Sequence, residues 1–224
     1  MADDQLRRES KSRYIPALAF TRLTSWYDPI VRWTTREEMF RTRLVAQSGV
    51  RPGDRVLDVG CGTGTLAIKI IQGQPGATIT GLDGDPAVLS QAKRKAGASG
   101  IPVTWIEGRA DALPFADSSF ERVVSSLLFH HLDRATKLNA LREIRRVLTP
   151  GGELHLADWG RAANPLMRIA FLSVQLLDGF ATTADNVDGL LPKLMSESGL
   201  ADVTETGRIA TPCGTLSHYR GVRR

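Results

Sequence analysis

The stretch between residues 56 and 65 restricts the possible folds most, because a short apolar run leads directly into three glycines and then into a helical pattern. Gly60, Gly62 and Gly64 can adopt positive φ angles and let the backbone approach a ligand closely. The helix that follows offers free N–H groups in its first turn. A strand, a glycine turn and a helix in this order predict an open α/β sheet that binds a ligand at the carboxyl end of its first strand.

The chain after residue 50 continues to alternate short apolar runs with helical patterns, which is typical of βαβ units and a parallel sheet. Strands are expected at 55–59, 78–82, 103–106, 122–127 and 153–157, and helices at 66–72, 86–96 and 135–148. Asp85 and Asn164 each precede a proline at a first helical position, a signal for a helix start. The last part predicts helices at 165–177 and 187–196 and strands at 201–206 and 215–222.

The first 48 residues lack this alternation and have a helical character. Thr34 and Thr35 each precede a glutamate by three positions, which is a capping-box pattern. The apolar residues between 39 and 45 are expected to form one helical face behind it, ending near Ser48. Since 224 residues correspond to about one and a half domains, we expect a helical cap over residues 1–49 and one ligand-binding domain over residues 50–224.

Composition and charge narrow the class of protein. Hydrophobic residues make up 42% of the chain, which argues against disorder, and the net charge of +5 is too small for a dedicated nucleic-acid binder. Cys61 and Cys213 form no CxxC or Cys/His cluster, so neither a disulfide framework nor a metal site is predicted. Without a signal-peptide pattern or an apolar run of about 18 residues, we expect a cytoplasmic protein that has no membrane span.

The spacing of glycines and acidic residues distinguishes between nucleotide ligands. A dinucleotide fingerprint, Gly-x-Gly-x-x-Gly, requires its third glycine at position 65, where this chain has Thr65. Asp58, two positions before Gly60, is a poor neighbour for a phosphate and a good one for an ammonium group. Asp83 closes the second expected strand, where a carboxylate accepts hydrogen bonds from both hydroxyls of a ribose. A ribose and an amino group without a pyrophosphate describe S-adenosylmethionine.

Five motifs in order extend this interpretation, and they lie at 58–64, 81–83, 112–120, 123–132 and 141–152. With them the chain resembles class I S-adenosylmethionine-dependent methyltransferases over about residues 50–224, in the small branch that includes quinone-biosynthesis C-methyltransferases. The resemblance implies a three-layer, Rossmann-like α/β fold. Its seven-stranded sheet would be mostly parallel, with a reversed last strand at 215–222.

The same resemblance assigns roles to the first two motifs. It implies that Gly60, Cys61 and Gly62 pass their backbone beside the methionine part of the cofactor. Asp58 would help to fix the loop and the amino group, and Asp83 would hold the ribose. Cys61 would therefore contact the cofactor through its backbone rather than as a thiol.

The adenine end of the expected cofactor site departs from the family pattern. The family commonly has Gly-Asp-Ala where this chain has Gly-Arg-Ala, and Arg109 cannot accept the hydrogen bond from the adenine amino group. Ala110 keeps the backbone contact, and Asp111 could substitute only if the loop shifts. Gly84 stands where an apolar residue usually packs on adenine, whereas Ser126 in the fourth motif is a matching cofactor-binding position. We therefore expect the cofactor to bind more weakly than is typical.

His130 and His131 are the candidate catalytic residues, since they follow the fourth expected strand at the edge where the methyl donor would lie. Adjacent residues of an extended segment point in opposite directions, so at most one is expected to face the acceptor. The alternative is that His131 packs or hydrogen-bonds against the sheet. Trp159, at the end of the fifth strand, either contacts the substrate or serves in packing.

The leading hypothesis is an enzyme that transfers a methyl group from S-adenosylmethionine to a carbon, oxygen or nitrogen atom of a small molecule by in-line displacement. A nicotinamide-dependent oxidoreductase and a noncatalytic cofactor-binding module are the alternatives. No nucleic-acid partner is expected. The apolar residues between 166 and 180 are compatible with a hydrophobic substrate and equally with a packed helix, and the basic N-terminal segment favours a polar or anionic group on that substrate.

Overall fold

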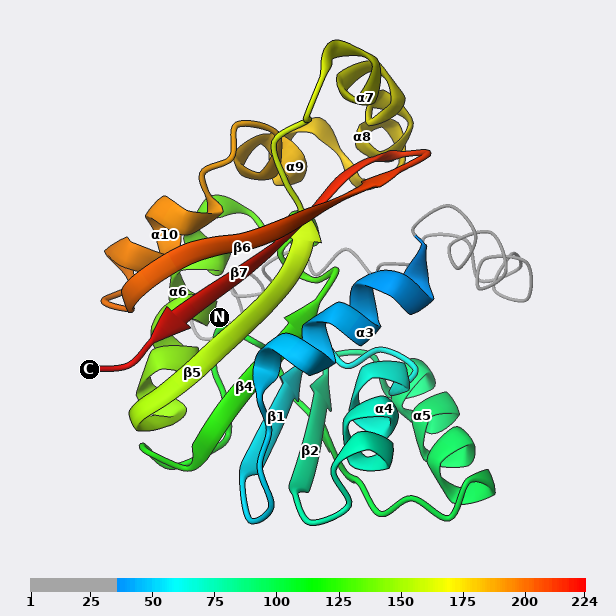
Figure 1. Cartoon of the computed structure of the whole chain (residues 1–224), viewed down its shortest axis with the longest axis vertical. Coiled ribbons are helices and arrows are strands. Elements are labelled where there is room, and N and C mark those ends of the chain that lie inside the picture. The colour runs from blue at the N-terminus through cyan, green and yellow to red at the C-terminus, as the bar shows by residue number, and fades with distance from the viewer. Residues whose placement is uncertain (1–35) are drawn as a thin grey trace, which may run out of the picture.

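The computed structural model describes residues 36–224, so the helical character expected before residue 36 lies outside the described residues. Within this part of the chain, seven strands form one sheet in the order β3-β2-β1-β4-β5-β7-β6 (Figure 1). The strands are β1 (Arg55–Val59), β2 (Thr78–Asp83), β3 (Thr104–Glu107), β4 (Phe120–Ser126), β5 (Leu148–Trp159), β6 (Ala201–Thr211) and β7 (Gly214–Val222). Neighbours among β1 to β5 are parallel, and β7 is antiparallel to both β5 and β6. The expected sheet with a reversed last strand is confirmed.

Helices connect most of these strands and cover the sheet (Figure 1). They are α3 (Glu37–Ser48), α4 (Thr65–Gly73), α5 (Pro86–Ala98), α6 (Arg134–Val147), α7 (Pro165–Ala170), α8 (Leu172–Asp178), α9 (Phe180–Val187) and α10 (Leu191–Glu197), with a 3₁₀ turn η1 (Phe129–His131) after β4. The two expected helix starts are present, because Asp85 caps α5 through the N–H groups of its first turn and Asn164 caps α7 in the same way.

Successive residues of the central strands point into two separate cores, which gives the fold its three layers. Leu57 and Val123 pack with α6 and α10 on one face of the sheet. Val56 and Val124, their neighbours in sequence, pack with α3 and α4 on the other face. The period of two along each strand thus accounts for the apolar runs, since strands covered on both faces need apolar residues at every position.

Helix α3 lies on the same face of the sheet as α4 and buries Phe40 and Leu44 there. Met39, which was expected on this face, is 52% exposed, because one residue along a helix rotates the side chain by about 100°. The helix begins after Arg36, which has a left-handed conformation and makes no side-chain capping bond. The two threonines of the expected capping boxes precede the described residues.

The single helix expected at 165–177 is wrong, because α7 and α8 are separate helices that meet at Phe171. Phe171 is buried, and its ring packs against Trp159 with centroids 5.2 Å apart. Similarly, the helix expected at 187–196 is divided between α9 and α10, with Gly189 at a φ of +72° between them. Strand β5 begins at Leu148, five residues earlier than expected, since Leu148 already pairs with Phe120 of β4.

Candidate cofactor and acceptor site

The glycine loop after β1 is fastened to the end of β2 by its own backbone. The N–H groups of Gly60 and Cys61 both donate to the Leu82 carbonyl, at 2.8 and 3.0 Å. The N–H of Gly62 donates to Oδ2 of Asp83 at 2.9 Å. Gly60 and Gly62 have φ angles of +70° and +54°, which are compatible with glycine and costly for other residues. The loop is therefore held as a close-approach surface at the carboxyl edge of the sheet.

The third glycine of the loop has a packing reason that sequence reasoning missed. Gly64 has a φ of +74°, and a Cβ atom there would lie 2.3 Å from the ring of Trp105 on β3. Gly81, the partner of Trp105 in the β2–β3 register, would place a Cβ 2.6 Å from the same ring. Both glycines leave room for one indole beneath the loop. A tryptophan pairing with a glycine in the next strand was the available signal.

Asp58 is the most unusual group of the site, because it is fully buried and neither carboxylate oxygen has a hydrogen-bond partner. Burial raises the pKa of this carboxyl to about 7; the positive charge of Arg41 and the nearby Ala67 N–H oppose this effect, and the negative charge of Asp83 reinforces it. A buried carboxylate without partners is costly unless a cation satisfies it. The position is compatible with the ammonium group of S-adenosylmethionine, and that role of Asp58 stays a prediction.

Asp83 ends β2 beside this loop and accepts one backbone N–H on each oxygen. The Gly62 N–H binds Oδ2, and the Asp85 N–H binds Oδ1 at 3.0 Å. Each oxygen keeps a lone pair, so the carboxylate can still accept two hydroxyl groups of a ribose. Burial raises the pKa of Asp83 above its usual value. Gly84, half-buried, follows directly and continues this edge.

At the expected adenine end, Arg109 pairs with Asp111 in a bidentate arrangement, with N–O distances of 2.9 and 2.7 Å. Arg109 occupies the position of the family's aspartate. Asp111, the carboxylate that could have replaced that aspartate, is therefore already bound to Arg109. The loop lies at the end of β2, because the Gly108 N–H donates to the Asp83 carbonyl at 3.0 Å. Ala110 packs against the edge of the core. Weak adenine recognition stays a prediction.

The end of β4 brings the remaining predicted residues toward the loop. Ser126 is the last residue of this strand, and the buried hydroxyl of Ser125 donates to the Val59 carbonyl at 2.7 Å, which ties β4 to β1 beside the glycines. Leu128 lies two residues further along. A Cβ atom at Gly60 would be only 2.9 Å from its side chain, so Leu128 packs closely against this glycine. The segment after β4 thus contacts the cofactor loop directly.

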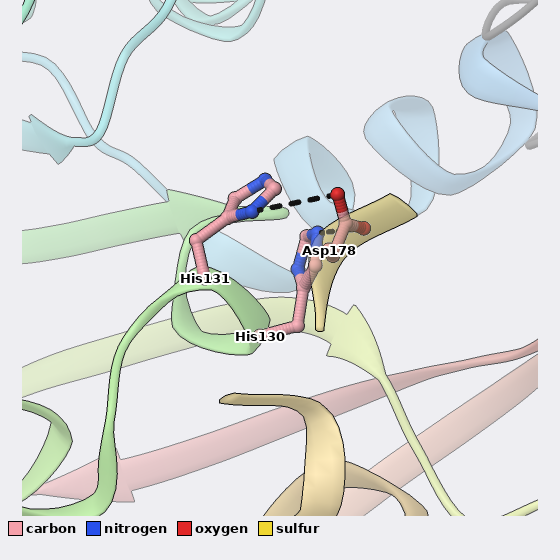
Figure 2. A group of neighbouring side chains, drawn as sticks. All are labelled: His130, His131 and Asp178. Atoms are coloured by element: carbon pink, nitrogen blue, oxygen red, sulfur yellow. Dashed lines mark ion pairs between the residues drawn. The ribbon is translucent and has the colours of Figure 1, made fainter. Parts of the chain in front are cut away.

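The expectation that at most one of the two histidines faces the acceptor assumed an extended segment, and that premise is wrong. They lie in the 3₁₀ turn η1 rather than in an extended segment, and their rings stand 3.9 Å apart, centroid to centroid. Figure 2 shows both imidazoles turned toward Asp178, the last residue of α8. Nε2 of His130 is 3.6 Å from one oxygen of Asp178, and Nδ1 of His131 is 3.8 Å from the other.

A buried aspartate holds His130 from the opposite side. Nδ1 of His130 is 2.8 Å from Oδ1 of Asp158 at the end of β5, and since a carboxylate only accepts, this nitrogen carries the proton. The N–H groups of Phe129 and Trp159 also donate to Asp158, each at 2.7 Å, and Asn186 adds a longer bond at 3.3 Å. Burial works to raise the pKa of Asp158, but its interaction with His130 and these donors outweigh it and leave the pKa below its usual value.

The surroundings of the other candidate residues differ from one another. Trp159 is buried between Phe171 and the edge of His130, which agrees with the packing alternative. His131 is not hydrogen-bonded into the sheet, and burial together with the charge of His130 lowers its pKa to about 3. Burial raises the pKa of the Cys61 thiol, so it is a poor nucleophile. Asp178 and Asn186 were not foreseen, since neither belongs to a recognisable motif.

Comparison with known proteins agrees with this geometry. Residues 56–152 match the family described as "Methyltransferase domain". The chain is 32% identical over 153 residues to a ubiquinone/menaquinone biosynthesis C-methyltransferase of Paracoccus denitrificans, covering 66% of this chain and 60% of that protein. It is 38% identical over 120 residues to a demethylmenaquinone methyltransferase of Thermus thermophilus, covering 54% of each chain. The chain thus spans about 60% of the length of the first of these curated relatives.

Solved structures share the fold at lower identity. The YcgJ protein of Bacillus subtilis superimposes with a TM-score of 0.64 at 18% identity, over 82% of this chain and 97% of that one. The cyclase SpnF does so with a TM-score of 0.65 at 17% identity, over 83% of this chain and 80% of that one. Residues 56–152 therefore form a methyltransferase domain, and the resemblance to class I S-adenosylmethionine-dependent methyltransferases is confirmed.

None of the helices that residues 36–224 form is long and apolar enough to cross a membrane.

Proposed function

We propose that this chain transfers a methyl group from S-adenosylmethionine to a ring carbon of a quinol-type small molecule. The observation that carries the proposal is the buried carboxylate of Asp58, which has no hydrogen-bond partner at the loop where the cofactor's ammonium group is expected. The printed names of the curated relatives supply the acceptor class, ubiquinone and menaquinone precursors. Because the chain covers only part of those proteins, the acceptor is an inference for this one.

The residues that would hold the cofactor lie along one edge of the sheet. Asp58 would bind the ammonium group, the backbone of Gly60 to Gly62 would line the methionine part, and Asp83 would accept the ribose hydroxyls. Gly84, Ala110 and Ser126 would complete the surface. When bound, S-adenosylmethionine supplies an electrophilic methyl group: the ring carbon donates an electron pair to it, the carbon–sulfur bonding pair stays on sulfur, and the ring carbon then loses a proton.

The side chains on the acceptor side come from η1 and α7–α9. His130 and His131 are proposed to face the acceptor, since they follow Leu128, which contacts the glycine loop. Several large apolar side chains are exposed nearby in sequence, on α7, α8 and the start of α9, and they are Leu166, Ile169, Leu172, Leu176, Leu177 and Phe180. Exposed apolar surface of this kind favours binding of an acceptor that has an apolar part, or contact with another apolar surface.

Binding of S-adenosylhomocysteine by isothermal titration calorimetry tests the cofactor assignment. We expect binding to the wild-type chain, a loss of at least tenfold in affinity for Asp58→Asn, and no binding of NAD. Asp188→Asn, an exposed aspartate in the turn after α9, is the matched control and should bind like the wild type. Binding of NAD in place of S-adenosylhomocysteine would favour the oxidoreductase alternative instead.

Methyl transfer is tested separately with labelled S-adenosylmethionine and a short-chain demethylated naphthoquinol kept reduced under anaerobic conditions. A labelled ring-methyl product is expected, and mass spectrometry distinguishes it from a labelled ether. Cofactor binding without transfer to this acceptor or to a matching benzoquinol would contradict the proposed activity and favour the noncatalytic alternative. The cyclase SpnF shows that this fold also serves chemistry other than methyl transfer.

A further inference from the structure

We propose that His130, His131 and Asp178 bind one divalent transition-metal ion of the zinc type at the acceptor side of the site. The ligand atoms would be Nε2 of His130, Nδ1 of His131 and a carboxylate oxygen of Asp178, which come within 4.8 Å of one another (Figure 2). Two imidazoles and one carboxylate are a ligand set that zinc and similar ions accept. No metal site was predicted from the sequence, because Cys61 and Cys213 form no CxxC or Cys/His cluster.

The distances within this cluster fit a shared ion better than direct hydrogen bonds. Nε2 of His130 and Nδ1 of His131 are 3.6 and 3.8 Å from the oxygens of Asp178, beyond the range of a good hydrogen bond. Two ligand atoms bound to one zinc ion at tetrahedral angles lie about 3.4 Å apart. All three ligand atoms lie within 4.8 Å of one another, so small rotations of these side chains would bring both nitrogens and one oxygen to bonding distance from a common centre.

Asp158 prepares His130 for this role. Because Nδ1 of His130 is engaged by Asp158 at 2.8 Å, Nε2, the nitrogen that faces Asp178, is the one left to bind an ion. Asp158 is itself fixed by backbone N–H groups on both sides, so the ring has one orientation and one tautomer. A carboxylate behind a ligating histidine is the usual arrangement around protein-bound metal ions, where it orients the ring and raises its basicity.

The charges around the cluster also favour a cation. Asp158 and Asp178 approach His130 from two sides, with Oδ1 of Asp158 at 2.8 Å and Oδ2 of Asp178 at 3.6 Å. The cationic side chains of the neighbouring helix α6 are directed elsewhere, since Arg134 and Lys137 both contact Asp185, at 2.8 and 3.3 Å. A divalent ion would offset the charge of the two carboxylates.

The ion's role follows from its position and rests on the proposed function. The side chains of His131 and Asp178 are 23% and 21% exposed, so a further coordination position can point outward to a ligand. An acceptor hydroxyl bound there would lose its proton to water more readily, because a Lewis acid lowers the pKa of a coordinated oxygen. The resulting oxyanion raises the electron density of the ring carbon that takes the methyl group.

Cobalt(II) is the probe for the site, used with the full 224-residue chain carrying no histidine tag and freed of metal with a chelator. We expect one ion per chain with the visible absorption of a four- or five-coordinate cobalt site. Asp178→Asn and His131→Gln should each weaken binding at least tenfold, whereas Asp188→Asn should not change it. Unchanged thermal unfolding and unchanged S-adenosylhomocysteine binding in both variants would show that the fold and the cofactor site are intact.

Failure of the metal proposal and failure of the proposed function have different signatures. Absence of stoichiometric cobalt binding, or binding that Asp178→Asn leaves unchanged, would overturn the metal site even if methyl transfer is observed. Stoichiometric binding that both variants weaken supports the site even if the naphthoquinol is not methylated. Full methyl-transfer activity in the metal-free chain would contradict the ion's part in activating the acceptor.

Discussion

Replacing Asp58 by asparagine should stabilise the cofactor-free protein at neutral pH while weakening its binding of S-adenosylmethionine at least tenfold. Asp58 is fully buried, and neither of its oxygens has a hydrogen-bond partner. Its ionised form is therefore the less favourable one in the folded state, as the pKa of about 7 expresses. Asparagine has nearly the same shape and cannot ionise, so it keeps the packing and removes the buried charge.

The size of the effect follows from the pKa in the two states. The pKa rises from 3.8 to about 7 on folding, and at about 1.4 kcal/mol per pKa unit this corresponds to roughly 4 kcal/mol. Because the folded pKa is raised, the folded state binds the proton more tightly, and stability falls as the pH rises between about 4 and 7. The penalty is absent well below pH 4 and constant above pH 8. Asp58→Asn should thus gain about 2–4 kcal/mol at pH 7.5 and almost nothing at pH 4.

Urea unfolding followed by circular dichroism, without cofactor and at several pH values, measures this difference directly. Asp188→Asn, which changes an exposed aspartate, should follow the wild-type curve at every pH. If Asp58→Asn is less stable than the wild type at pH 7.5, the Asp58 carboxylate is already stabilised by protein groups in the absence of cofactor. The proposal that it binds the ammonium group of the cofactor would then be wrong. An equal gain at pH 4 and pH 7.5 would also contradict the electrostatic explanation.

Three further predictions address the adenine end, the glycine loop and an ion pair of the sheet. Arg109→Asp should bind S-adenosylhomocysteine about fivefold more tightly by calorimetry, because it restores an acceptor at that position. Gly64→Ala should lower the free energy of unfolding in urea by roughly 2–4 kcal/mol, since residue 64 has a φ of +74° and its Cβ would lie 2.3 Å from an indole carbon of Trp105. Gly97→Ala is the control: no described atom lies within 4 Å of its Cβ, so this variant should raise the free energy of unfolding by about 0.5–1 kcal/mol. Hydrogen bonds from Arg220 at 2.7 and 2.8 Å lower the pKa of Glu153 to about 2. The Glu153 carboxylate therefore stabilises the fold above about pH 4.5, and this stabilisation is lost as the pH falls through 2. Glu153→Gln should lower the free energy of unfolding in urea by about 1–2 kcal/mol at pH 7, allowing for solvent screening, and leave it unchanged at pH 2.

The sheet was predictable because its strands carry two independent signals. Buried parallel strands need apolar residues at every position, and turn residues separate them at regular intervals. Val56 and Leu57 belong to different cores, yet both appear in the sequence as one apolar run. The cofactor loop was predictable for the same reason, since glycine at positive φ and an acidic residue before it are local features.

The acceptor side was not predictable from local patterns. His130 and His131 lie in a 3₁₀ turn, which has no strong sequence signal over three residues, so their common orientation could not be inferred. Asp178 reaches them only because the chain breaks at Phe171, where tertiary contacts with Trp159 override the helical pattern. Contacts between segments about 50 residues apart leave no trace in the spacing of a single sequence.

The properties of Asp58 connect the stability of this chain with its ligand. A carboxylate buried without partners lowers the stability of the free protein, and in the proposed function the ammonium group of the cofactor offsets that cost. Cofactor at 100 times its dissociation constant adds about 2.7 kcal/mol to the free energy of unfolding, which is comparable to the penalty that the buried charge imposes. The wild type should therefore gain stability from S-adenosylhomocysteine and Asp58→Asn should gain little, so that the order of their stabilities narrows or reverses when the ligand is added. The proposed function thus accounts for a destabilising residue at this position through binding.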